Sequence, residues 1–378
     1  MKILHVMQTL DIERGGGVTA RNLKLIQYLE NNNSENYILS LKDKNNPSKK
    51  SYLSEKRIFD LNYFNDRYPI PFINIIKFAR VIKKVDIVHL TSFWTILNAY
   101  TYIFCKLFSK KYIVSPAGAI KIINRSKLIK RIYYDLIGSR IINDASAIIS
   151  ITKKEEKDFL EKKIPHNKIF NIPNGIDINN DKEDNRFKQK NIDISSLKPY
   201  ILFVGRLNYI KGPDILLNAF KLIANQIPKH NLVFAGNDDG MGKELKYIAN
   251  NSLCLDRIHF LGFIRANLKN KLYKNADFLV IPSRSEAMSL VVLEAGIQGT
   301  ESIFTNECGL EIISEKKLGV CVPAEALELA NAIENKINKK SSKLINYDLI
   351  DFVTNNFNWN KISLDFLKVL EIVIRNEY

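Results

Sequence analysis

Short runs of β-branched and aromatic residues alternate along this chain with stretches in which apolar residues recur every three or four positions. In the first half, the runs KILHV, YILSL, DIVHL and YIVS are separated by helical patterns over residues 19–31, 73–84 and 93–108. In the second half, YILFVG, NLVFAG, IHFLG and FLVIPS are separated by helical patterns at 214–227, at 243–251 and around Leu272, and a further one follows at 289–298. Such alternation predicts βαβ units and a parallel, doubly wound sheet in each half.

The chain also contains one segment without apolar clustering, residues 176–198, which is dense in Asp, Asn and Lys. A length of 378 residues suggests two domains. We therefore predict a first domain over 1–175, a linker over 176–198 and a second domain over 199–359. Residues 360–378 carry apolar side chains at helical spacing and are predicted to form a packed terminal helix.

The composition, with 46% hydrophobic and 25% charged residues, is that of a globular protein. The four cysteines are far apart and show no C-x-x-C spacing, which favours reduced thiols and no zinc site. Polar residues interrupt both the first apolar run and the apolar stretch 93–108, so neither resembles a secretory signal or a membrane span. We expect a cytoplasmic protein.

A net charge of +16 invites an anionic partner such as nucleic acid, an acidic membrane surface or a phosphorylated substrate. The chain lacks the interleaved aromatic and basic patterns of RNA-binding modules, which argues against nucleic acid. Residues 106–140 mix Lys and Arg with apolar residues. That segment is either a contact with an anionic membrane, at the inner face of the cytoplasmic membrane, or a solvated basic helix face.

The richest candidate site is IPSRSEAMSLVVLEAG, residues 281–296. A strand is expected to end at Pro282, and Ser289 is placed to cap a helix that begins at Leu290, whose free N–H groups would bind an anion. Glu294 lies about one turn inside that helix, and Glu286 approaches from the loop. Two carboxylates beside an anion site suit a ligand with phosphate and several hydroxyls, although the spacing of the two glutamates is weak evidence alone.

Two further loops follow predicted strands. Arg206 and Lys211, in FVGRLNYIKGPDILLNAF, are spaced to converge on a diphosphate, although a solvated basic loop is equally compatible with the spacing. Glu13, Arg14 and the glycines at 15–17 form a predicted loop between the first strand and a helix that starts near Val18. Glycines let the backbone approach an anion or a sugar closely.

These motifs together resemble the retaining GT-B glycosyltransferases of family 4, which share the Glu, seven residues, Glu spacing. The resemblance extends to IFNIPNGIDI, to HFLGFIRANLKNKLYKNADFLVIPS and to FNW before the last helix. It implies a GT-B architecture, in which two Rossmann-like domains face each other across a cleft and the terminal helix crosses back to the first domain.

The resemblance also implies roles for individual residues. Arg206 and Lys211 would hold the donor diphosphate, Glu294 the ribose and Glu286 the transferred sugar. Gly16 and Gly17 would face Glu286 across the cleft. The remaining donor-binding residues implied by the motifs are Ile264, whose backbone would contact the nucleobase, and Met288, Ser289 and Leu290.

The chain departs from the family pattern in two places. Many members have Ser-Pro-His-Gly where this chain has Ser115-Pro116-Ala117-Gly118, so no histidine acid or base is predicted there; the longer segment resembles a subgroup associated with polysaccharide and lipopolysaccharide assembly. His89, at a strand end, could line the cleft or be structural. Glu301 replaces the usual proline of Thr-Pro-Val and adds a charge near the donor helix.

The predicted reaction is transfer of a hexosyl group from a UDP- or GDP-sugar to a hydroxyl of a glycan or lipid-linked acceptor, with retained anomeric configuration. No carboxylate is evident as a nucleophile in the first domain, so we expect front-face attack without a metal or other cofactor. Two alternatives remain open: a nucleotide-sugar epimerase on the same scaffold, and a basic protein that binds nucleic acid or an anionic surface.

Overall fold

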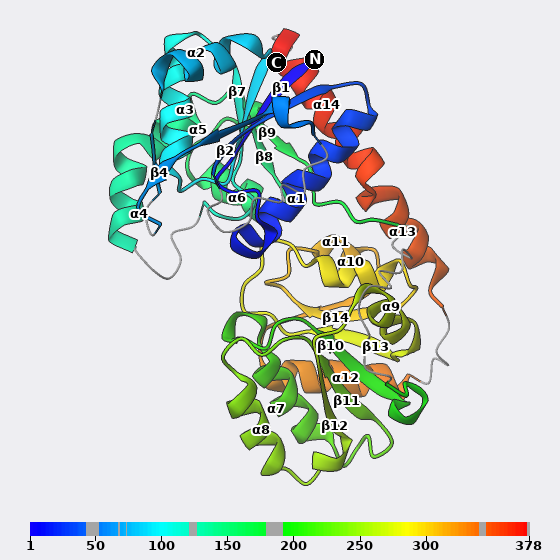
Figure 1. Cartoon of the computed structure of the whole chain (residues 1–378). Coiled ribbons are helices and arrows are strands. Elements are labelled where there is room, and N and C mark those ends of the chain that lie inside the picture. Colours follow the sequence, from blue (N-terminus) through cyan, green and yellow to red (C-terminus); the bar gives the residue numbers. More distant parts are fainter. Residues whose placement is uncertain are drawn as a thin grey trace. The chain divides into compact units, whose positions relative to one another are not determined.

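The computed structural model describes residues 1–42, 53–66, 69–72, 74–120, 127–178, 192–339 and 345–375. The chain divides into two compact units (Figure 1). The first unit comprises Met1–Gly175 and the segment that begins at Trp359, and the second comprises Ile176–Asn358. Residues 179–191 of the predicted linker lie outside the described residues, and so do residues 121–126 of the predicted basic segment.

The first unit is built on a parallel sheet, as the sequence predicted, and the sheet has seven strands. The strand order is β3-β2-β1-β6-β7-β8-β9. The bounds are β1 Lys2–Met7, β2 Glu35–Leu41, β3 Ile58–Leu61, β6 Ile87–Thr91, β7 Tyr112–Ser115, β8 Ala147–Ser150 and β9 Ile169–Asn171. The order reverses between β1 and β6, and the carboxyl ends of strands at such a switch point are where open α/β sheets bind ligands. A short hairpin, β4 Tyr63–Phe64 and β5 Ile70–Pro71, stands apart from the sheet.

Helices cover both faces of this sheet. The side chains of Leu4 and Val6 pack on one side with α2 Ile75–Lys84, α3 Ile96–Leu107, α5 Ser139–Asn143 and α6 Lys153–Glu161. The alternate residue Ile3 packs on the other side with α1 Ile12–Asn31 and α14 Trp359–Arg375. This alternation follows from the two-residue period of a strand that is buried on both faces. Helix α4 Lys127–Tyr133 runs directly into a π-helical turn, Tyr134–Gly138.

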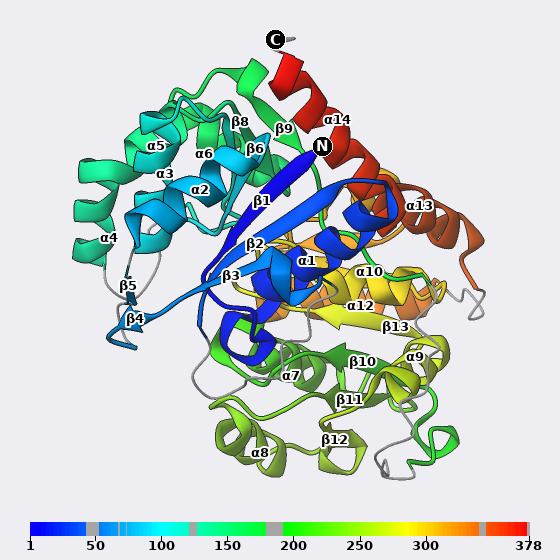
Figure 2. The same cartoon turned by 45° about the horizontal axis from the view of Figure 1, so that its top comes forward.

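The terminal helix α14 belongs to the first unit because its apolar face is buried there. Helices α1 and α14 lie side by side in both views (Figures 1 and 2). Trp359 and Phe366 pack in one cluster with Leu25 and Leu29 of α1. A Cβ atom at Gly175 would lie 2.5 Å from the Trp359 ring, so this close packing requires a glycine.

The predicted glycine loop before α1 is wrong in one respect. Helical structure begins at Ile12, and the Gly15 amide donates a 2.8 Å hydrogen bond to the Asp11 carbonyl. The helix is interrupted at Gly16, where φ is 59° and ψ is −147°. Glycine adopts this backbone conformation without steric cost, so the triplet forms a kink inside a helix rather than an open loop.

The second unit contains a six-stranded parallel sheet in the order β12-β11-β10-β13-β14-β15. Its strands are β10 Tyr200–Val204, β11 Asn231–Ala235, β12 Ile258–Gly262, β13 Phe278–Ile281, β14 Ser302–Thr305 and β15 Val320–Val322. Its helices are α7 Pro213–Ile223, α8 Gly242–Asn250, α9 Ala266–Asn275, α10 Leu290–Gly296, α11 Glu311–Glu315, α12 Ala326–Asn338 and α13 Tyr347–Phe357. Helices α7, α8 and α12 share a core with one face of the sheet, whereas α10 contacts α9, α13 and the strands β13 and β14. The sheet is therefore doubly wound, as predicted.

Short 3-10 turns complete the described structure, at Glu55–Arg57, His166–Lys168, Ser195–Leu197, Tyr209–Lys211 and Leu255–Arg257. Within the described part of the chain, none of the helices has both the length and the apolar character needed to span a bilayer.

Two histidines lie buried in the first sheet. His5 and His89 face each other on adjacent strands, and their Nδ1 atoms are 3.0 Å apart. Both side chains are fully inaccessible, and His89 also contacts the Phe366 ring of α14. Burial lowers the pKa of His5 to about 4 and the pKa of His89 well below its usual value, so both rings are neutral at pH 7. The open question about His89 is thus settled in favour of an interior position.

The neutral His5 ring predicts acid sensitivity of the first unit. Between pH 6.5 and 4, His5 is protonated in the unfolded chain but stays neutral in the native protein. The free energy of unfolding therefore falls as the pH drops from 6.5 to 4. The pKa difference corresponds to a loss on the order of 3 kcal/mol. Both tryptophans, Trp94 and Trp359, lie in the first unit, so urea unfolding followed by tryptophan fluorescence reports on that unit.

The pH series is compared with two variants. His5→Asn should reduce the dependence on pH and leave the part that the buried His89 contributes, whereas His166→Gln, which removes an exposed histidine of the same unit, should retain the wild-type slope. An equal slope in the wild type and in His5→Asn would contradict the prediction.

Candidate functional site

Two predicted site residues meet at the carboxyl edge of the second sheet. Asn208 accepts a hydrogen bond from the Lys211 amide and so caps the 3-10 turn that follows β10. The Lys211 ammonium then lies 2.8 Å from Oε2 of Glu286, which is in the loop after β13. The two side chains are 24% and 9% exposed. The structure therefore brings a cation and a carboxylate together in a largely desolvated ion pair.

The loops that carry this pair are joined by Arg284, which the sequence analysis did not single out. Its guanidinium forms two hydrogen bonds with the Asp214 carboxylate, at 2.8 and 2.5 Å, and its Nη1 also donates to the Tyr209 carbonyl. Its amide donates to the Ile210 carbonyl. The Asp214 carboxylate holds the pKa of Arg284 above its usual value. A bidentate pair of this geometry fixes the spacing of the two loops, and Arg284 was missed because its partner is 70 residues away.

The position of Glu286 is fixed from its other side as well. Its Oε1 accepts a hydrogen bond from the hydroxyl of Ser283, which is fully buried, and its amide donates to the Glu307 carbonyl at 3.0 Å. The Ser283 carbonyl in turn accepts from the Thr305 hydroxyl at 2.6 Å. The Glu286 carboxylate is thus pre-oriented before any ligand binds.

Helix α10 begins where the sequence predicted, at Leu290, but the predicted cap is wrong. The Ser289 side chain forms no capping hydrogen bond. Its backbone is extended, as at an N-cap, and its amide donates to the Cys308 carbonyl at 2.9 Å. Among the described residues, its hydroxyl is buried with no hydrogen-bond partner. Met288 beside it is buried, whereas Leu290 is half-buried.

Glu294 has partners of its own. Its Oε2 accepts from the Tyr273 hydroxyl at 2.9 Å and lies 2.8 Å from the Lys269 ammonium, and both partners come from α9. Burial, reinforced by the Glu294 carboxylate, holds the pKa of Tyr273 well above its usual value, so the phenol stays a donor. No described hydrogen bond or ion pair joins Glu294 to Glu286. The two carboxylates are therefore held by separate sets of residues, which the sequence analysis did not anticipate.

The other predicted residues of this unit have weaker restraints. Arg206 lies 2.8 Å from Oδ2 of Asp239 in an exposed pair, and the Asn208 amide donates to the same oxygen. An exposed pair of this kind contributes little stability, so the guanidinium is available to an anionic ligand. Ile264 is buried in the turn between β12 and α9, close to Gly262, where φ is 71°.

Gly16 and Gly17 lie in the first unit, in exposed backbone after β1. A cavity of about 290 Å³ lies beside this segment, at the switch point between the ends of β1 and β6. Polar groups of Thr9, Asn22 and Ser92 line it. Asn22 is buried, and its Oδ1 has no hydrogen-bond partner among the described residues. This site is lined with groups that suit a hydroxyl-bearing ligand.

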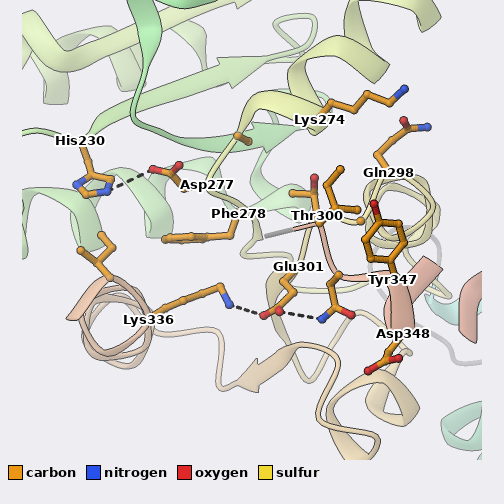
Figure 3. A pocket seen from close by; sticks show the side chains of 15 residues that line it. His230, Lys274, Asp277, Phe278, Gln298, Thr300, Glu301, Lys336, Tyr347 and Asp348 are labelled. Atoms are coloured by element: carbon orange, nitrogen blue, oxygen red, sulfur yellow. Dashed lines mark hydrogen bonds and ion pairs between the residues drawn. The ribbon is translucent and has the colours of Figure 1, made fainter. Parts of the chain in front are cut away.

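A second cavity, of about 700 Å³, lies at the opposite edge of the second sheet, before β13 and β14 (Figure 3). Glu301 projects into it, pairs with the Lys336 ammonium and accepts from the Asn346 amide at 2.9 Å. Asn346 also caps α13. Glu301, which stands where the family usually has a proline, therefore connects α12 and the start of α13 to the sheet through these two contacts. No predicted donor-site residue lines this cavity.

Two family models match the chain in succession. Residues 15–180 match the model of "Glycosyltransferase Family 4", and residues 184–347 match that of "Glycosyl transferases group 1". An uncharacterized glycosyltransferase of Methanocaldococcus jannaschii is 30% identical over 227 residues, which cover 56% of this chain and 55% of the relative. The chain thus spans about half the length of that relative.

Solved structures share the fold over nearly the whole length. The Anabaena protein HepE, crystallised with UDP, superposes with a TM-score of 0.76 at 19% identity and covers 98% of this chain and 100% of its own. The lipopolysaccharide outer core galactosyltransferase WaaB superposes with a TM-score of 0.71 at 16% identity, with full coverage of both chains. The predicted fold class is confirmed.

Gly212 lies where the loops after β10 and β13 meet, and we expect its substitution to lower the stability of the second unit. Its φ is 65°, and a Cβ atom there would lie 2.2 Å from the Pro282 carbonyl oxygen. Gly212→Ala should therefore destabilise the second unit by more than the ~1 kcal/mol that left-handed backbone costs an alanine, as measured by calorimetric unfolding.

Gly262→Ala is the matched control, because φ at Gly262 is 71° and a Cβ there meets nothing within 4 Å. It should show the backbone cost alone. Equal losses in the two variants would mean that the contact between the loops is not tight.

Proposed function

Since this chain belongs to the group 1 glycosyltransferases and has their two-unit GT-B fold, we propose that it transfers a hexosyl group from a nucleoside-diphosphate sugar to an acceptor hydroxyl, with retention of configuration. The observation that carries this proposal is the Lys211 and Glu286 pair at the carboxyl edge of the second sheet. It provides a cation for a diphosphate and a carboxylate for sugar hydroxyls within 2.8 Å of each other.

The diphosphate is assigned to Lys211 and Arg206. Lys211 forms an ion pair with Glu286, and Arg206 forms one with the exposed Asp239. Both contacts are to carboxylates, which phosphate oxygens resemble in charge and geometry, so a diphosphate can replace them without leaving a cation unpaired. Stabilising the charge that develops on the leaving group is the largest contribution that such cations make to the rate.

The nucleoside and the sugar are assigned to different groups of the same unit. Glu294 accepts from the ribose hydroxyls, held in orientation by Tyr273 and Lys269. The backbone near Ile264 contacts the nucleobase, and the segment of Met288, Ser289 and Leu290 contributes backbone groups to the donor. A ligand group beside Ser289 would supply the partner that its buried hydroxyl lacks.

The first unit is assigned to the acceptor. The cavity of about 290 Å³ at its switch point supports this, because it is lined by polar groups, the charged Arg14 and Asp66 among them, and by Asn22, whose Oδ1 is buried. A glycan or a lipid-linked saccharide presents the hydroxyls that such a cavity suits. HepE, a protein of the same fold, was crystallised with UDP, which favours a UDP-sugar as donor.

The proposed chemistry is attack from the front face. The acceptor oxygen bonds to the anomeric carbon on the side from which the diphosphate departs, the bond from that carbon to the phosphate oxygen breaks, and the acceptor proton passes to that oxygen. Glu286 positions the sugar and does not form a covalent intermediate. Two cations at the diphosphate make a metal ion unnecessary.

The proposed setting is synthesis of a cell-surface polysaccharide or lipopolysaccharide at the cytoplasmic face of a membrane. A membrane contact is supported by α4 and the turn after it. Leu128, Ile132 and Leu136 are spaced four residues apart, and each is about half exposed or more. Basic Lys127 and Arg131 adjoin them. An apolar stripe with flanking cations is the pattern of a helix that rests on an anionic bilayer surface.

The transfer proposal predicts large kinetic effects at the central pair. Glu286→Gln and Lys211→Ala should each lower kcat by roughly 100-fold or more, because each removes a group that acts on the reacting part of the donor. Glu294→Gln should mainly raise the donor KM. Initial rates with the sugar nucleotide that the wild type turns over provide the measurement.

The matched controls are Glu328→Gln and Lys221→Ala, which remove exposed charges of the same unit. Near-normal kcat in both central variants would sink the assignment. The same assay after removal of metal with EDTA checks the proposed independence from metal.

The membrane proposal predicts that the triple variant Leu128→Ser, Ile132→Ser, Leu136→Ser loses co-sedimentation with vesicles of anionic phospholipid, while the wild type sediments with them at low salt. Leu253→Ser, at a fully exposed leucine of the second unit, is the control and should bind as the wild type does. Equal sedimentation of the triple variant and the wild type would remove the idea.

A further inference from the structure

The cavity of about 700 Å³ in the second unit is separate from the candidate donor site. It lies at the amino edge of the sheet, beside the residues that precede β13, whereas Glu286 and Lys211 lie at the carboxyl edge. Strand β13 has four residues, which separate the two edges by about 13 Å at the rise of a β-strand. A molecule in this cavity therefore does not touch the proposed reacting groups.

Two pairs of polar groups line one side of the cavity. Glu301 pairs with the Lys336 ammonium and accepts from the Asn346 amide at 2.9 Å. Although burial raises the pKa of Glu301, the bonds from Lys336 and Asn346 hold that pKa below its usual value, so the carboxylate is charged at pH 7. Nε2 of His230 lies 3.3 Å from Oδ2 of Asp277. Both carboxylates thus already have partners within the protein.

These pairs retain unused capacity for hydrogen bonds. A carboxylate accepts several hydrogen bonds and an ammonium donates several, so the contact between Glu301 and Lys336 satisfies only part of each group. A hydroxyl can donate to the carboxylate while a neighbouring hydroxyl accepts from the ammonium, and a vicinal diol therefore binds across the pair without separating it. An ionic ligand would have to displace one partner, which is costly for half-buried charges.

The described lining as a whole favours neither sign of charge. Three carboxylates face two ammonium groups and one imidazole, contributed by Asp277, Glu301, Asp348, Lys274, Lys336 and His230. A wall so nearly balanced does not concentrate a small anion or a small cation. The charge distribution therefore points to an uncharged polar ligand.

Uncharged groups and apolar surface complete the lining. Among the described residues, the side chains of Gln298 and Tyr347 have no hydrogen-bond partner. Tyr347 is the first residue of α13 and is 69% exposed, and the Phe278 ring lies between the two pairs in Figure 3. A saccharide ring has hydroxyls at its edge and C–H groups on its faces, so it suits a wall that combines amides, paired charges and aromatic rings.

Glu301 makes this wall a feature of the chain. The family usually has proline at this position, and proline has no carboxylate for Lys336 and Asn346 to meet. The cavity therefore depends on a departure from the family pattern that the donor site does not explain.

We propose that this cavity is a glycan-binding site, which holds a stretch of the neutral saccharide that the enzyme extends while transfer takes place elsewhere. This inference rests on the proposed function for the role of the glycan. The volume is more than twice that of the cavity in the first unit and lies in the range of ligand pockets, so it has room for an oligosaccharide rather than a single sugar.

Binding is measured by saturation-transfer difference NMR with maltotetraose, cellotetraose, laminaritetraose and N-acetylated chitotetraose. The wild type should bind at least one of these probes. Tyr347→Ala and Glu301→Gln should each weaken that binding about fivefold or more, because each removes a contact with the saccharide. Tyr347 is exposed, so its replacement should leave the melting temperature within a few degrees of the wild type.

Tyr247→Ala is the matched control. Tyr247 is a tyrosine of the same unit that is 72% exposed and does not line the cavity. The affinity of this variant for the oligosaccharide should be that of the wild type within about twofold.

The inference is overturned if the wild type binds none of the four oligosaccharides, or if Tyr347→Ala and Glu301→Gln both bind as the wild type does, which would assign the binding to another surface. Binding of pyrophosphate or spermidine that depends on Tyr347, in place of the oligosaccharides, would assign the cavity to an ion and overturn it as well. Turnover of sugar nucleotides is measured separately. A wild type that binds an oligosaccharide here and turns over no sugar nucleotide contradicts the proposed function and retains the site.

Discussion

The candidate donor site depends on the ion pair between Lys211 and Glu286, and that pair depends on Arg284. A lysine and a glutamate on separate loops meet in a desolvated environment only if the two backbones are held in register. The bidentate contact of Arg284 with Asp214 and the backbone bond to Ile210 provide this register. The left-handed glycine at 212 is what lets the loops approach closely enough. Charge and packing therefore cooperate at one junction.

Ion pairs within the protein stabilise the charged groups of the candidate site. Each charged group proposed to touch the donor has a protein partner: Glu286 has Lys211, Glu294 has Lys269, and Arg206 has Asp239. Leaving any of the more buried charges unpaired would cost several kcal/mol. Ligand binding is then an exchange of partners, and the exposed Arg206 pair is the easiest to exchange.

The first unit uses buried polar groups differently. Its two histidines are neutral and form hydrogen bonds to other buried side chains, and its buried Glu155 accepts from the backbone amides of Gly118 and Ile151. Ala117, whose φ is 52°, is the position where the chain departs from its family pattern. Helices α1 and α14 cover the sheet on the side where Ile3 and the histidines lie.

The sequence by itself determined the doubly wound parallel sheets, the start of α10 at Leu290 and the terminal helix, because each depends on a local period of apolar residues or on a chain break that neighbouring residues reveal. It also predicted Lys211 and Glu286 as site residues, through the motif they share with a family. Only the tertiary structure decided that these two residues form an ion pair. It also decided that Glu294 bonds to Tyr273 and Lys269, and that Ser289 does not cap its helix. Those contacts join residues far apart in the chain, and hydrogen-bond partners across such distances follow from the packing of whole elements rather than from any local pattern. The histidine pair is of the same kind: His5 and His89 are 84 positions apart, and only the register of β1 against β6 makes them neighbours.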